Sequence, residues 1–111
     1  MDKLEQYRQI IHDVLKDYAT ESPLGGAIES ATVFDPQSDH YLLVDFGWQG
    51  QKRVYNCLIH LEIRARKIWI QRNQTDCSLT DELLERGVDK DDIILGLQPP
   101  ELRQYTDLGV G

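Results

Sequence analysis

The chain has 111 residues, of which 41% are hydrophobic and 28% are charged. This length predicts one domain over residues 1–111, because a typical domain needs about 100 residues or more. The composition is that of a globular protein and excludes collagen-like and intrinsically disordered chains. Nineteen acidic and twelve basic residues give a formal net charge of −7. That charge argues against a free-standing DNA or RNA binder, which needs Lys and Arg to neutralise phosphates.

No segment approaches the roughly 18 consecutive apolar residues of a membrane-spanning helix. The first residues lack the basic and then apolar pattern of a signal peptide. The two cysteines, Cys57 and Cys77, form no CxxC motif and no disulfide framework. We therefore expect a cytoplasmic protein with reduced thiols and no membrane segment.

The first predicted element is a helix, because apolar residues recur at spacings of three and four near the start of the chain. These residues are Leu4, Tyr7, Ile10, Ile11, Val14, Leu15 and Tyr18. Pro23, followed by Gly25 and Gly26, predicts where the helix ends. A one-sided apolar stripe of this kind indicates a helix that lies on a sheet.

Four strands are predicted next, over residues 27–35, 41–48, 53–64 and 67–72. In the second strand, alternation places Leu42, Val44, Phe46 and Trp48 on one face and Tyr41, Leu43 and Asp45 on the other. In the third strand, the residues predicted to share one face are Tyr55, Cys57, Ile59, Leu61 and Ile63. The short connections predict that neighbouring strands pair antiparallel.

The opposite face of this sheet still carries Leu43, Leu58 and Trp69. That is more apolar surface than a face open to water requires. We therefore expect either the C-terminal segment or a second copy of the chain, in a homodimer, to cover part of it.

Short helices are predicted in the last third of the chain. Thr80 is the predicted N-cap of the first, and Gly87 suits the position just after its end. A second short helix is predicted after Asp89, and a helical turn over residues 101–105. The predicted fold class is therefore α+β: an N-terminal helix packed on a roughly four-stranded antiparallel sheet, with short C-terminal helices.

Motifs for catalysis or ligand binding are missing from the sequence. His12, His40 and His60 show no zinc-ligand spacing, and no phosphate-binding loop or GxSxG turn occurs. His60 is expected to be partly buried and hydrogen-bonded, and Cys57 to be a small core residue. We assign no catalytic, cofactor-binding or metal-binding residue and expect a protein that is not an enzyme.

Charge is distributed unevenly along the chain. Residues 52–72 hold six basic residues and one acidic residue, whereas residues 76–111 hold three basic and nine acidic residues. The basic hairpin also carries Tyr55 and Trp69, a composition seen in faces that bind single-stranded nucleic acid. Two other interpretations are possible. The charged side chains simply keep a turn solvated and prevent strand-edge aggregation, or they bind an acidic partner. Because the whole chain is acidic, we favour a protein partner over DNA, which is expected to be contacted only indirectly or weakly. The candidate interaction surface comprises Leu43, Arg53, Leu58, Arg64, Arg66, Lys67, Trp69 and Arg72.

The whole chain resembles the XisI family, the excision-controlling factors of the fdxN genetic element. The stretches that carry the resemblance include Met1–Ile11, Asp39–Leu43, Lys67–Gln71, Asp81–Leu84 and Asp92–Gly96. Two segments depart from the family pattern. The turn reads Arg64-Ala65-Arg66, and Gln71 is followed by Arg72-Asn73-Gln74, which makes this end of the sheet more positive than the family pattern implies.

The resemblance implies a role in programmed DNA rearrangement in cyanobacteria, beside a separate recombinase and a companion factor, XisH, that is similar to endonuclease-fold proteins. Three functions remain open. The chain acts without catalysis through the XisH-like companion, or it inhibits a nuclease-fold companion as an antitoxin would, or it binds DNA directly. The last requires Arg53, Arg64, Arg66, Lys67 and Arg72 to converge on one surface.

Overall fold

The computed structural model describes residues 2–20, 27–75 and 77–110. The predicted end of the first helix, at Pro23 to Gly26, lies outside them. The helices are α1 (Lys3–Thr20), α2 (Leu79–Glu85), the 3₁₀ helix η1 (Lys90–Asp92) and α3 (Pro100–Arg103). The strands are β1 (Ile28–Asp35), β2 (His40–Gln49), β3 (Lys52–Arg64), β4 (Lys67–Asn73) and β5 (Ile93–Ile94).

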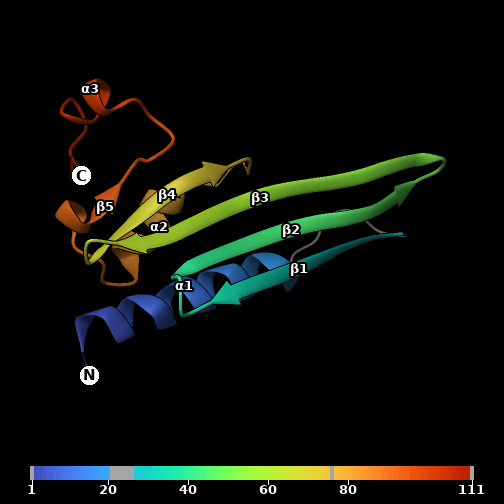
Figure 1. Cartoon of the computed structure of the whole chain (residues 1–111), viewed down its shortest axis with the longest axis horizontal. Helices are drawn as coiled ribbons and strands as arrows, with labels where there is room; N and C mark the ends of the chain where they lie inside the picture. The colour runs from blue at the N-terminus through green and yellow to red at the C-terminus, as the bar shows by residue number, and fades with distance from the viewer. Residues whose placement is uncertain (1, 21–26, 76, 111) are drawn as a thin grey trace.

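The strands form one sheet in the order β1-β2-β3-β4-β5, and α1 packs on one of its faces (Figure 1). The first four strands pair antiparallel, as predicted. The short β5 adds a parallel fifth strand beside β4, which the sequence did not predict. The predicted α+β class is confirmed. The paired β2 and β3 extend beyond β4 as a long arm (Figure 1).

The core lies between α1 and the sheet. The helix contributes the predicted stripe, with Tyr7, Ile11, Val14 and Leu15 fully or almost fully buried. The sheet contributes Tyr41, Leu43, Ile59, Leu61, Ile63, Ile68 and Ile70, and the C-terminal third adds Leu79, Leu83, Val88 and Ile93. Burial of apolar area of this kind is the main favourable contribution to folding.

The face of β2 that α1 covers is not the predicted one. Tyr41 and Leu43 are buried in the core, whereas Leu42 and Val44 are only half-buried on the other face. Both faces of β2 are apolar, so alternation alone did not indicate which one the helix covers. We call the sheet face turned away from α1 the open face.

The prediction for β3 was wrong in part because the strand contains a β-bulge. Leu43 pairs with Ile59 but Val44 pairs with Cys57, so Leu58 is an extra residue. From Cys57 backwards the side chains change faces, and Cys57 lies half-buried on the open face instead of in the core. Such a one-residue insertion reverses the face of every side chain beyond it.

In the C-terminal third, Ser78 and not Thr80 caps α2. The Ser78 hydroxyl accepts a hydrogen bond from the Asp81 backbone N–H at 3.3 Å. Gly87 follows the helix with φ +105°, as predicted for a glycine at this position. Asp89 precedes η1 without a side-chain capping bond, and the predicted turn after residue 100 is α3.

A charged network joins α1 to the turn between β1 and β2. The Arg8 guanidinium donates to both carboxylate oxygens of Asp39, at 2.9 and 3.2 Å, and the Tyr41 hydroxyl donates to Asp39 at 2.7 Å. Hydrogen bonds from Arg8, then from Tyr41, hold the pKa of Asp39 below its usual range. Burial and the neighbouring Asp39 raise the pKa of Tyr41 to about 12.

We predict that Asp39→Asn lowers the free energy of unfolding by about 1 kcal/mol at neutral pH, because hydrogen bonds to a charged group are worth more than neutral ones and Arg8 keeps access to water. Asn tolerates the positive φ of 55° found at this position, so backbone strain does not contribute. Urea unfolding measures the change. The control, Asp107→Asn, alters a largely hydrated carboxylate and is expected to have no measurable effect; equal effects of the two substitutions would contradict the prediction.

Candidate interaction surface

The open face of the sheet carries a strip of apolar side chains, which we call the apolar ladder: Val33, Leu42, Val44, Phe46, Trp48 and Tyr55. Val33 pairs with Leu42, and Phe46 pairs with Tyr55, so the ladder crosses three strands. Val33 is 48% exposed and Tyr55 is 68% exposed. An antiparallel sheet with one face in water usually carries polar residues there, so this face departs from the ordinary pattern.

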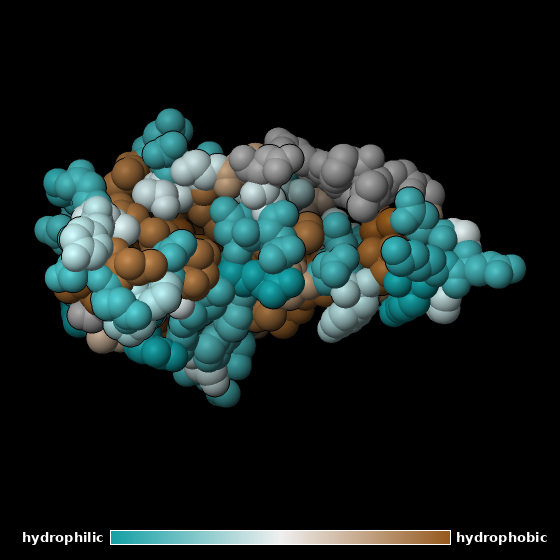
Figure 2. Space-filling model, turned by 90° about the horizontal axis from the view of Figure 1, so that it is seen from above, coloured by the Kyte–Doolittle hydropathy of each residue, from teal (hydrophilic) through white to brown (hydrophobic). Residues whose placement is uncertain are grey.

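The ladder ends near the tip of the β2–β3 arm at a cation–π pair. The Arg53 guanidinium lies 5.4 Å from the centre of the Trp48 ring. Trp48 itself is 50% exposed. Beyond this pair, the turn is mainly hydrophilic (Figure 2), as expected from Gln49, Gln51 and Lys52. Apolar contact area therefore stops short of the tip.

At the other end of the open face, Trp69 lies between two guanidinium groups. Arg64 and Arg103 each lie 5.1 Å from its ring centre, and the indole N–H donates to the Arg64 carbonyl at 3.2 Å. Arg103 comes from α3, so the C-terminal segment covers this part of the sheet. This was one of the two coverings that the sequence predicted for the open face. Trp69 is half-buried. Its ring mainly makes contacts within the chain and offers little surface to a partner.

Two histidines and a glutamate connect these two ends. His40 Nδ1 lies 3.0 Å from His60 Nε2, and the other nitrogen of His40 lies 3.5 Å from Glu62. Glu62 is 7% exposed and accepts hydrogen bonds from Gln71 at 2.9 Å and from Arg64. His60 is thus half-buried and hydrogen-bonded, as predicted. Because one of the two facing nitrogens must donate and the other accept, protonation of both rings breaks this hydrogen bond.

We predict that the histidine pair makes stability fall as the pH decreases through about 6.5. Burial, then the neighbouring His40, lowers the pKa of His60 below 6.5. The unfolded chain therefore binds more protons than the folded chain below that pH, and acid favours unfolding. Urea unfolding measures the free energy of unfolding at about pH 7.5 and about pH 5.5. The loss of this free energy between the two pH values is expected to be smaller for His60→Gln, and for His40→Gln, than for the natural chain. Identical differences in all three proteins would refute this.

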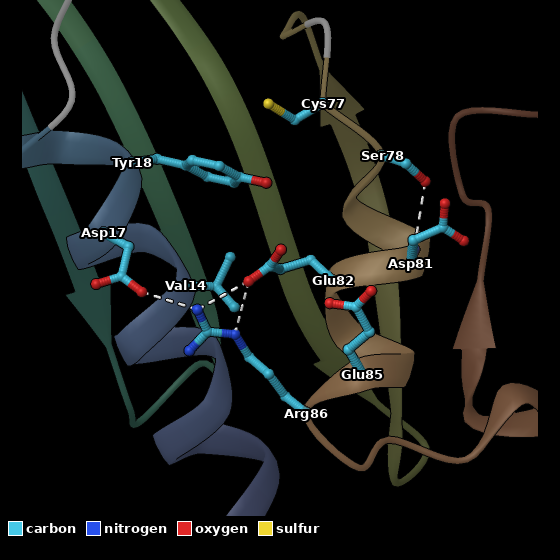
Figure 3. A pocket seen from close by; sticks show the side chains of 9 residues that line it. All are labelled: Val14, Asp17, Tyr18, Cys77, Ser78, Asp81, Glu82, Glu85 and Arg86. Carbon is cyan, nitrogen blue, oxygen red and sulfur yellow. Dashed lines mark hydrogen bonds and ion pairs between the residues drawn. The ribbon is translucent and has the colours of Figure 1, made fainter.

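A second feature is a cleft of about 680 Å³ between α1 and α2 (Figure 3). Arg86 lies in it and bridges the helices, 2.8 Å from both Asp17 and Glu82. Asp81 and Glu85 line the same cleft, so carboxylates outnumber the single guanidinium. Sequence reasoning missed this cleft, because Asp17 and Arg86 meet only when α2 packs beside α1.

Within the described residues, no three His, Cys, Asp or Glu side chains come together as a set that could hold a metal ion. No helix in the same part of the chain is long and apolar enough to cross a membrane. Cys77 is exposed, and burial raises the pKa of the Cys57 thiol.

The family model for the XisI protein matches residues 1–110. The chain belongs to the XisI family. It superposes with a TM-score of 0.93 on the crystal structure of a XisI-like protein from Anabaena variabilis ATCC 29413, at 41% identity over 97% of this chain and 99% of the other. A second crystal structure, of the fdxN element excision controlling factor XisI from the same organism, superposes with a TM-score of 0.85 at 35% identity, over 99% of this chain and 100% of the other. No curated protein matches the chain.

These matches confirm the XisI resemblance seen in the sequence. They do not test the candidate interaction surface. The structure shows that two of its eight predicted residues do not lie at an outer surface. Leu43 is 2% exposed beneath α1, and Leu58 packs against the core, so neither belongs to an outer surface. The remaining six residues lie on the open face or, for Arg66, in the turn at its end.

The basic residues of this surface fall into two groups. Arg64, Arg66 and Lys67 lie together at the β3–β4 turn, and Arg72 lies further along β4, near the end of the strand; we call these four residues the basic end. Arg53 lies eleven residues before Arg64 on the same strand, which corresponds to roughly 35 Å of extended chain. The five cations required for direct DNA binding therefore do not converge.

Proposed function

We propose that this XisI-family chain is an accessory factor that controls the excision of a DNA element, and that it acts without catalysis by binding an XisH-type companion protein. Family membership supports the first part, together with the similarity to a structure described as an fdxN element excision controlling factor. The second part is supported by the basic end, where four cations gather on a chain whose formal net charge is −7.

The basic end is suited to an acidic protein surface. Two of its cations have acidic neighbours within the chain: Arg64 pairs with the buried Glu62, and Lys67 interacts electrostatically with Asp92. Arg66 and Arg72 stay exposed to water. Exposed like charges on one face attract a partner of opposite sign and orient its approach, more than they add to final affinity.

Direct DNA binding is disfavoured by the same geometry. Arg53 is about 35 Å from Arg64 along the strand, and the C-terminal third of the chain carries nine acidic residues against three basic ones. Binding to a phosphate backbone depends on neutralising several neighbouring phosphates at once, which four residues at one sheet end achieve only over a short length of duplex.

The acidic cleft between α1 and α2 favours a second candidate function, that of an antitoxin-like inhibitor of a nuclease-fold companion. Asp17 of α1 and Asp81, Glu82 and Glu85 of α2 line this cleft from its two sides (Figure 3), and a surface rich in carboxylates resembles phosphates to a nucleic-acid-binding site. The companion expressed alone would then be toxic, and co-expression of this chain would relieve the toxicity. A harmless companion excludes this function and leaves the accessory role in place.

For the accessory role, we predict that Arg66→Glu with Lys67→Glu weakens the complex with the companion by about tenfold or more, because two contacts become repulsive. Co-purification from a strain expressing both proteins, followed by titration calorimetry at low and high salt, measures the effect. The natural complex is also expected to weaken as salt rises.

The matched control is Lys16→Glu with Lys52→Glu, which makes the same change in net charge at exposed positions on α1 and on the arm. It is expected to bind almost normally. No complex between the natural proteins would refute the proposal, and equal weakening by the two double variants would refute the role of the basic end.

A further inference from the structure

The apolar ladder calls for an explanation that the basic end does not provide. Strand β2 is apolar on both faces, which is the pattern of a strand covered on both sides. One face lies beneath α1. On the open face, the described part of the C-terminal segment reaches β4 and β5 and lies away from β1 (Figure 1). The half-buried Leu42, Val44 and Phe46 therefore face outward next to the exposed Val33 and Tyr55.

Charges border the ladder in a directional pattern. On the β1 side, Glu29 and Asp35 face the open side of the sheet, because they pair with Phe46 and His40. On the β3 and β4 side, the border is formed by Arg53 and Arg72, which pair with Trp48 and His60. All four charged residues are exposed. The open face is thus acidic along one edge, apolar in the middle and basic along the other edge.

We infer that the apolar ladder is the docking site of a second copy of this chain, related by a two-fold axis that runs along β2 in the plane between the two copies. Such an axis exchanges the two edges of the ladder, so that β1 of each copy lies over β3 of the other and stays clear of Trp69, which Arg103 already covers. Acidic edges then face basic edges twice, and the apolar strips meet in the middle. An interface of this kind is self-complementary, which is the requirement for a closed symmetric dimer.

The charge pattern selects this arrangement over its alternatives. A two-fold axis perpendicular to the strands would place β1 over β1, so that Glu29 and Asp35 would meet carboxylates of the same edge. Like charges brought together in this way cost free energy. A uniformly acidic or basic partner would match one edge and be repelled by the other. Face-to-face packing of sheets about 10 Å apart would cover Val33, Phe46 and Tyr55.

The test exploits the symmetry and needs only this chain. In the dimer of Glu29→Lys, the new lysine faces Arg53 at both contacts, and in the dimer of Arg53→Glu, the new glutamate faces Glu29 at both contacts, so each variant alone brings like charges together at this position. In a one-to-one mixture, the substituted position of one copy would face the substituted position of the other with opposite charge. At the second contact of that mixed dimer, the natural Glu29 and Arg53 face each other. Sedimentation velocity is used to measure the mass, with 12.8 kDa for the single chain.

We expect the natural chain to sediment at twice the mass of the single chain at micromolar concentration, and each variant to dissociate with a constant about tenfold higher or more. The mixture is expected to recover the dimer. Val33→Lys, which places a charge in the middle of the ladder, is expected to give monomers. Lys16→Glu, an exposed charge reversal on α1, is expected to leave the dimer intact.

Circular dichroism and thermal unfolding of each variant, as a monomer, control for loss of structure. A natural chain that stays monomeric at a few hundred micromolar overturns the inference, as does a dimer that Val33→Lys leaves unchanged. A mixture of the two charge variants that stays monomeric overturns the proposed two-fold arrangement. None of these results depends on the companion protein, so this inference and the proposed function can fail separately.

Discussion

The pairing of β2 with β3 determines what each face of this protein carries. The bulge at Leu58 lets Ile59, Leu61 and Ile63 face the helix while Tyr55 and Cys57 face the open side. Without the extra residue, one alternating run would place all five on the same face, and the helix side of the arm would gain an aromatic ring where α1 no longer reaches. The extra residue thus adds Tyr55 to the apolar ladder while Ile59, Leu61 and Ile63 stay in the core.

Sequence periodicity predicted the elements whose signal is local. The stripe of α1, the alternation of Ile68 and Ile70 in β4 and the glycine at position 87 each depend on neighbours a few residues away, and the structure agrees with all three. The faces of β2 and β3 were not predictable in this way, because both parities of each strand contain apolar residues. Which parity is buried depends on where α1 packs and where the bulge lies, and both are set by contacts distant in sequence.

The candidate sites also differ in whether they depend on residues that are close or distant in sequence. Arg64, Arg66 and Lys67 stay together because one tight turn holds them, so sequence alone located the basic end. By contrast, the approach of His40 to His60 requires the β2–β3 register, and the contact of Arg103 with Trp69 requires the C-terminal segment to fold back over β4. Leu43 and Leu58 were wrongly predicted to lie at the surface, because alternation alone could not show which face of β2 and β3 the helix covers.

Glu62 explains how two different surfaces share one sheet face. A buried carboxylate is stable only when its oxygens are hydrogen-bonded, and here Gln71, Arg64 and His40 surround it. It therefore holds Arg64 at the basic end and contacts the ring of His40. Burial also lowers the pKa of His60, which lies on the open face opposite Leu42 of the apolar ladder. The basic end and the apolar ladder thus share one sheet face and meet at Arg72, which belongs to the basic end and also borders the ladder.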